Sequence, residues 1–193
     1  MDFIDRIFII NLKHRTDRWK DIMEELSTAD VPMEKVERFD AIQKSPGWLG
    51  CTMSHFGCLS LAKDRGYRAV LILEDDFSIF EPCRFAENLG KIRDAGFAWD
   101  MMFLTGTVFD ASPHNDHFNR IGLLFSSSAY VIQKSYMDTL LANYQEAIDL
   151  PDKLDENWKV LQRRDRWFVF KNRVGCQRSG YSDIEERYVN YGC

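Results

Sequence analysis

The sequence predicts a single domain that folds as an α/β/α sandwich with a mostly parallel central sheet. Short, continuous apolar runs recur along the chain, which is the pattern of strands buried on both faces. The segments between them carry apolar residues at helical spacing, and the two patterns alternate. With 193 residues, 45% of them hydrophobic and 28% charged, the chain is long enough to bury one core.

The N-terminal part of the chain predicts two β–α pairs followed by a third strand. Residues 6–11 are an apolar run bounded by polar residues, and residues 69–73 are a second such run. Gly66 stands where the helix before the second run should stop. In chain order we expect strand 6–11, helix 16–29, strand 36–39, helix 52–64 and strand 69–73.

The second half of the chain predicts a less regular continuation of the same pattern. Residues 111–119, which include Pro113, are expected to form a polar loop. Three serines at 126–128 suggest a turn between two short strands. In chain order we expect helix 85–95, strand 101–105, strands 123–125 and 129–132, helix 135–144 and strand 167–170.

Charge and cysteine usage exclude several classes of protein. Lys and Arg total 25 against 30 Asp and Glu, so the net charge of −5 gives no general attraction to nucleic acid or anionic lipid. No apolar stretch approaches the roughly 18 residues of a membrane span, and the N-terminus lacks the basic region of a secretory signal. The five cysteines are scattered without CxxC pairs, so we expect reduced thiols in a cytoplasmic protein.

Polar side chains follow the predicted strands where each strand ends. In open α/β sheets, ligands bind beyond the carboxyl ends of the strands. A functional site is therefore expected at this edge of the sheet. The polar residues there are Asn11, Asp40, Glu74, Asp75, Asp76 and Thr105.

The acidic run Glu74, Asp75 and Asp76 is the first candidate for chemistry. Three consecutive carboxylates beside an apolar strand repel one another unless a cation offsets them. Their hard oxygen atoms suit Mn²⁺ or Mg²⁺, which take further ligands from substrate phosphates. The alternative is that the three acids only end a strand and solvate a turn.

Basic and histidine side chains give weaker signals. Arg15 and Arg18 lie three residues apart at the start of a predicted helix, where they share a face that favours an anion. A solvated first turn is the alternative. His55 opens the helix before the acidic strand and is either structural or part of the site. His114 and His117 have the spacing of zinc ligands but lie in the polar loop without a nearby cysteine.

Taken together, these segments resemble glycosyltransferase family 25, which contains the lipooligosaccharide and procollagen sugar transferases and has a GT-A fold. The most specific match is the block 50–76, which includes Gly-Cys-Thr-Met-Ser-His and Leu-Ile-Leu-Glu-Asp-Asp. The other matching segments are 9–12 with Arg15, Asp17 and Arg18, then 39–41, 128–132 and 182–184.

The resemblance implies roles for individual residues. Residues 1–110 would bind the nucleotide-sugar and residues 111–193 would face the acceptor. Asp76 would be the first metal ligand, with Glu74 as a second, in a Glu-Asp-Asp run that stands for the family's DxD-type motif. The late acid of the family would be Asp155 or Asp152, of which Asp155 has the more helical setting. The expected donor-binding residues are Asn11, Leu12, Arg15, Arg18, Ala41, His55, Glu74 and Asp75.

The function expected from the resemblance is transfer of a sugar from a nucleotide-sugar, most plausibly a UDP-sugar, to a hydroxyl of a glycan or glycoprotein. If configuration inverts, a carboxylate must accept the proton of that hydroxyl. If configuration is retained, the leaving phosphate itself takes it. Two alternatives are a metal-dependent phosphatase and a sugar-binding or nucleotide-binding module without catalytic activity.

Overall fold

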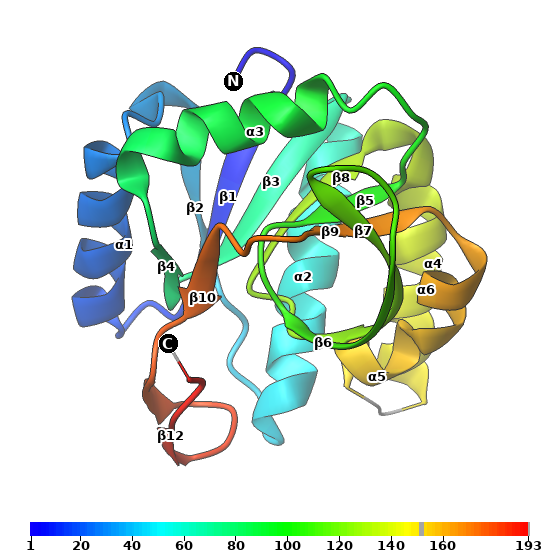
Figure 1. The fold of residues 1–193 in the computed structure, drawn as a ribbon. Coiled ribbons are helices and arrows are strands. Elements are labelled where there is room, and N and C mark those ends of the chain that lie inside the picture. The colour runs from blue at the N-terminus through cyan, green and yellow to red at the C-terminus, as the bar shows by residue number, and fades with distance from the viewer. Residues whose placement is uncertain (151–152, 193) are drawn as a thin grey trace.

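The computed structural model describes residues 1–150 and 153–192, which form an eight-stranded sheet with helices on both faces (Figure 1). The strand order is β2-β1-β3-β8-β5-β9-β7-β6. Strands β8 and β7 run opposite to the other six, so the sheet is mostly parallel, as predicted. The strands are β1 (Arg6–Asn11), β2 (Val36–Asp40), β3 (Ala69–Glu74), β5 (Met101–Phe103), β6 (Thr107–Pro113), β7 (Phe118–Phe125), β8 (Ala129–Gln133) and β9 (Trp167–Phe170).

Two hydrophobic clusters, one on each face of the sheet, hold the layers together. Side chains of a strand alternate between its faces, so Ile7 and Ile9 of β1 join one cluster while Phe8 and Ile10 join the other. The first cluster packs under α1 (Thr16–Thr28) and α3 (Phe85–Arg93). The second packs under α2 (Gly47–Asp64), α4 (Lys134–Asp149), α5 (Leu154–Asn157) and α6 (Lys159–Arg164).

Short elements complete the fold and were not predicted. Strand β4 (Phe77–Ile79) pairs with β10 (Gly175–Gln177), and β11 (Gly180–Ser182) pairs with β12 (Arg187–Val189). Two 3₁₀ turns, Met33–Lys35 and Pro82–Arg84, connect longer elements. The pairing of β4 with β10 brings the C-terminal segment beside the acidic run, which directly precedes β4.

The predicted polar loop at 111–119 is wrong. Residues up to Pro113 belong to β6, and β7 begins at Phe118. Strand β6 lies at the edge of the sheet and is exposed along most of its length, so it needs no apolar pattern, and its proline stands at the strand end.

Helix α2 begins at Gly47, five residues before the predicted start, because it extends through the apolar residues Trp48 and Leu49.

The cysteines differ from the expectation in one place. Cys51, Cys58 and Cys83 are free thiols, whereas Cys176 is disulfide-bonded. The expectation of reduced thiols throughout is therefore wrong for Cys176, and cysteine usage gives no support to a cytoplasmic location. Among the helices in the described part of the chain, none is both long and apolar enough to cross a bilayer.

Candidate functional site

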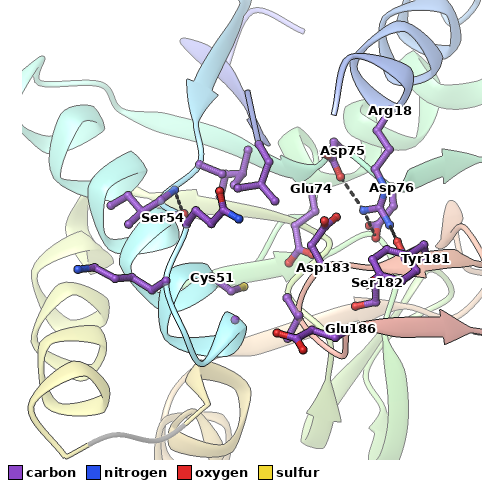
Figure 2. A pocket seen from close by; sticks show the side chains of 18 of the residues that line it. Arg18, Cys51, Ser54, Glu74, Asp75, Asp76, Tyr181, Ser182, Asp183 and Glu186 are labelled. Atoms are coloured by element: carbon purple, nitrogen blue, oxygen red, sulfur yellow. Dashed lines mark hydrogen bonds and ion pairs between the residues drawn. The ribbon is translucent and has the colours of Figure 1, made fainter. Parts of the chain in front are cut away.

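A cavity of about 480 Å³ opens where β1 and β3 end. The acidic run, Arg18 and the C-terminal residues Tyr181 and Ser182 line one side of it, and Cys51 and Ser54 of α2 line the other (Figure 2). Cavities of this size hold small-molecule ligands in many proteins. The lining residues used below are Leu12, Arg18, Ala41, Cys51, Glu74, Asp75, Asp76, Gln177, Tyr181 and Asp183.

Glu74 and the two aspartates that follow it lie on opposite faces of the sheet, because β3 ends at Glu74 and Asp75 and Asp76 form the turn that follows. Val70 and Ile72 of β3 pack on the α2 face, so Glu74, two residues further on, points to that face as well. Asp75 points to the α1 face, where Asn11 and Arg18 lie. The acidic run therefore divides into two differently surrounded parts.

On the α1 face, Arg18 and Asn11 hold Asp75 and Asp76. One guanidinium nitrogen of Arg18 donates to Asp75 and to Asp76, both at 2.9 Å. The other donates to the carbonyl of Tyr181 at 2.6 Å. The amide nitrogen of Asn11, at the end of β1, donates to Asp75 at 2.6 Å. One cation therefore serves two nearly buried carboxylates.

The negative charge of Asp76 is not fully compensated by the groups around it. Burial and the neighbouring carboxylates of Glu74 and Asp75 raise its pKa to about 7, although Arg18 acts in the opposite direction. Its Oδ1 atom is buried without a hydrogen-bond partner in the described part of the chain. Burial also raises the pKa of Asp75. These residues fit a divalent cation, because it would supply the missing positive charge and accept the free oxygen as a ligand.

On the α2 face, Glu74 belongs to a buried hydrogen-bond network. His55 Nε2 lies 3.2 Å from its Oε1, and the Ser127 hydroxyl donates to the same oxygen. His55 Nδ1 is 2.9 Å from the Tyr130 hydroxyl, which is 2.9 Å from that of Tyr144. Burial acts to raise the pKa of Glu74, but His55 and Ser127 outweigh it and the pKa is lowered.

A second cavity of about 240 Å³ adjoins the first and contains Asp155. Asp155 Oδ2 accepts a hydrogen bond from the backbone of Ser126 at 3.4 Å, and burial raises the pKa of this carboxyl. Trp48, Phe125 and Tyr191 supply aromatic surface to the cavity. The residues shared by both cavities are Cys51, Glu74, Gln177, Ser182 and Ile184.

The C-terminal segment closes the larger cavity against α1 and α2. Arg15 donates to Asp183 at 2.5 Å and also pairs with Asp17. A Cβ atom at Gly47 would lie 2.7 Å from the Cα atom of Ile184, so a side chain at the start of α2 would push this segment away. The wall therefore depends on contacts between residues far apart in the sequence.

The structure brings most of the predicted site residues together. Leu12, Arg18 and Ala41 line the larger cavity, and Asn11 and Arg15 lie beside it. His55 is buried and contacts Glu74 rather than the cavity. Asp155 lies in the smaller cavity, whereas Asp152 lies outside the described residues.

Sequence reasoning missed several residues of the site. Gln177 donates to Asp76 at 3.3 Å, Tyr181 offers its carbonyl to Arg18, and Ser127 binds Glu74. No local pattern marks these residues. The resemblance at 182–184 was the only signal that the C-terminal segment belongs to the site.

Comparison with curated proteins finds distant sequence relatives. The chain is 24% identical over 127 residues to procollagen galactosyltransferase 1 of Danio rerio and 27% identical over 129 residues to procollagen galactosyltransferase 2 of Homo sapiens. Each alignment covers 52% of this chain, which spans about a fifth of the length of these relatives. No protein-family model matches the sequence.

Comparison with solved structures supports the fold. Mannose-1-phosphate geranyltransferase from Thermus thermophilus aligns with a TM-score of 0.53 and 11% identity, over 86% of this chain and 72% of that chain. A glycosyltransferase involved in the glycosylation of the major capsid of PBCV-1 gives 0.52 and 9%, over 85% and 80%. UDP-glucose pyrophosphorylase complexed with UDP-glucose gives 0.53 and 7%, over 86% and 90%. The chain therefore has a GT-A-like α/β fold.

Proposed function

We propose that this chain is a glycosyltransferase of the family 25 type. It would move a sugar from a nucleotide-sugar, most plausibly a UDP-sugar, to a hydroxyl of a glycan or glycoprotein, with Mn²⁺ or Mg²⁺ bound by Asp76. The distant relatives are galactosyltransferases by name, and a structural neighbour carries UDP-glucose. Both observations support the proposal.

The observation that carries the proposal is the unpartnered oxygen of Asp76 at the larger cavity. Its position beside Asp75 and Arg18 supports a role for Asp76 in holding a divalent cation, which would lie next to the diphosphate of the donor. A divalent cation held there would neutralise the charge that develops as the diphosphate departs. The expected role of Glu74 as a second ligand of this ion is not part of the proposal, because its Oε1 atom contacts His55 on the α2 face.

The donor would occupy the larger cavity. Ala41 and Leu12 offer apolar surface for the nucleobase, and Asn11 fixes Asp75. Arg15 and Arg18 now bind carboxylates of the chain, so holding phosphate would require each to exchange a carboxylate partner for a phosphate oxygen. Residues 1–110 supply much of this wall, and Gln177 and the segment 181–186 supply the rest.

The acceptor would enter the smaller cavity. Its hydroxyl would then lie near Asp155, whose pKa is raised by burial, so that this carboxylate is a stronger base than an exposed one. This role applies if the reaction inverts configuration. The two cavities meet at Glu74 and Cys51, which is where the anomeric carbon and the hydroxyl would approach each other.

Thermal stability measured with a panel of nucleotide-sugars and Mn²⁺ tests the proposal. Selective binding to the folded state stabilises it by about 2.7 kcal/mol when the ligand is at 100 times its dissociation constant. We expect a rise in melting temperature with UDP-sugars that depends on Mn²⁺. No shift with any UDP-sugar would overturn the proposal.

Activity assays separate the proposal from the two alternatives. Release of UDP from a stabilising donor in the presence of Mn²⁺ is expected of a transferase. A phosphatase would instead hydrolyse phosphate monoesters, and a module without catalytic activity would bind the donor without releasing UDP. Either of those two results would contradict the proposed reaction.

A further inference from the structure

Three side chains of different chemistry meet on the α2 face, where the two cavities join. They are the thiol of Cys51, the imidazole of His55 and the carboxylate of Glu74, and one ligand atom of each lies within 4.8 Å of the others. Figure 2 shows the sulfur atom of Cys51 directed from α2 toward Glu74. The proposed transfer reaction assigns no role to the thiol or the imidazole.

Rigid elements hold these side chains. Cys51 and His55 are four residues apart on α2, so they share one face of the helix. Glu74 ends β3 and faces that helix. Sites built on helices and strands are held more accurately than sites on loops.

The surroundings of His55 orient it as a metal ligand. Its ring is fully buried, and its Nδ1 atom is 2.9 Å from the Tyr130 hydroxyl, which leaves Nε2 facing Glu74. Histidines that bind metals almost always use their other nitrogen in such a hydrogen bond, which fixes the tautomer and the ring orientation. Tyr144 fixes Tyr130 in turn through a 2.9 Å contact.

The distance between His55 and Glu74 agrees with tetrahedral coordination. Two ligand atoms, each about 2.0–2.1 Å from a tetrahedral zinc ion, lie about 3.3 Å apart. His55 Nε2 and Glu74 Oε1 are 3.2 Å apart. Cys51 is partly exposed and lines both cavities, so its side chain has room to rotate toward them.

We propose that Cys51 Sγ, His55 Nε2 and Glu74 Oε1 form a Zn²⁺ site that is separate from the oxygen site at Asp76. A thiolate, an imidazole and a carboxylate favour zinc, whereas Mn²⁺ and Mg²⁺ favour oxygen ligands alone. Binding releases the thiol proton to solvent. The proton between His55 Nε2 and Glu74 Oε1 moves to Nδ1, which then donates to Tyr130, or leaves to solvent if Nδ1 already carries one, and two metal–ligand bonds replace the contact between His55 and Glu74. The fourth position opens to the cavities, where water or substrate reaches it.

Cobalt spectroscopy tests this site without any assay of transfer, so the result does not depend on the proposed function. Co²⁺ added to the full chain should give a near-ultraviolet thiolate-to-cobalt band and the visible bands of a tetrahedral ion, and Zn²⁺ should abolish them. Cys51→Ser should lose the thiolate band. Cys58→Ser, seven residues along the same helix and buried, should keep it.

Two outcomes would overturn the proposal: no thiolate band in the wild-type protein, or an unchanged band in Cys51→Ser. Circular dichroism of each variant checks that it is folded. Asp76→Asn should keep the band, and its loss there would contradict a separate site.

Tyr130→Phe provides a second, graded test. Removal of such an outer hydrogen bond lowers metal affinity by about 10–100-fold. Competition with a chromophoric chelator should show a Zn²⁺ affinity reduced within that range. An unchanged affinity would contradict the orientation of His55 by Tyr130.

Discussion

The α1 face and the α2 face of the acidic run differ in how their carboxylates are compensated. On the α1 face, Asp75 and Asp76 share one guanidinium, and an oxygen of Asp76 has no partner in the described part of the chain. On the α2 face, Glu74 is satisfied by His55 and Ser127. Glu74 thus differs electrostatically from Asp75 and Asp76, because it ends β3 with its side chain toward α2, whereas the turn after β3 places both aspartates beside Arg18.

This difference shows that the α1 face, and not the α2 face, lacks positive charge. The α1 face has surplus negative charge at a cavity, which the proposed divalent cation would offset. On the α2 face, hydrogen bonds from His55 and Ser127 already compensate the charge of Glu74. A Zn²⁺ ion would bind there only by replacing the contact between His55 and Glu74. Substitutions that alter one face at a time therefore test the two faces separately.

The largest effect should come from Asp76→Ala, which removes the proposed ligand of the nucleotide-bound cation. A metal that stabilises the departing charge contributes several kcal/mol to transfer, so kcat/KM should fall at least about 100-fold. Steady-state transfer assays with Mn²⁺ measure this. Asp94→Asn, an ion-paired carboxylate remote from both cavities, serves as control, and full activity in Asp76→Ala would contradict the metal role.

Arg18→Met should cause the largest loss of stability. It leaves Asp75 and Asp76 without their shared cation, and an uncompensated buried charge costs about 3–5 kcal/mol. Urea denaturation at pH 7 measures the free energy of unfolding. The control is Arg93→Met, whose partner Asp94 is exposed, so that its loss should change the free energy of unfolding only slightly. Equal losses in both variants would contradict the account.

The pH dependence of stability should change with Asp76→Asn. Because the folded pKa of Asp76 is raised to about 7, the folded protein binds more protons than the unfolded chain from about pH 4 to 7. The contribution of Asp76 to the free energy of unfolding is present at low pH and is lost as pH rises through about 7. In metal-free melting experiments, the variant should therefore gain stability relative to wild type with rising pH. A gain that shrinks with pH would contradict this sign.

The smallest effect should come from Tyr144→Phe on the α2 face. The change removes one hydroxyl, which bonds Tyr130, and leaves the packing of the ring intact. We expect a loss of about 1 kcal/mol in the free energy of unfolding, measured in urea. Mn²⁺-dependent binding of UDP should not change, because the α1 face is untouched.

Local patterns in the sequence predicted the helices and strands of the layers but not the edge strand or the pairing of strands far apart in the chain. The strands 6–11 and 69–73 and the helix at 16–29 were predicted almost to the residue, because buried strands and amphipathic helices leave strong signals. Strand β6 was missed because an exposed edge strand needs no apolar pattern. Strands β4 and β10 were missed because their pairing joins residues about 100 positions apart.

Sequence patterns likewise predicted some residues of the candidate site and missed others. Asn11, Arg18, Asp75 and Asp76 follow from strand ends and a helix start, which sequence reasoning identifies. The separate direction of Glu74 requires the register of β3 against the helices. Gln177 and Tyr181 carry no signal of their own, since they reach the site only through long-range pairing of the C-terminal segment.

Calorimetric binding of UDP with and without Mn²⁺, compared between Asp76→Asn and Glu74→Gln, tests the central claim most directly. The claim is that the α1 face holds the cation and diphosphate. We expect Asp76→Asn to lose the Mn²⁺-dependent part of the affinity and Glu74→Gln to keep it. Loss in Glu74→Gln with retention in Asp76→Asn would contradict the account.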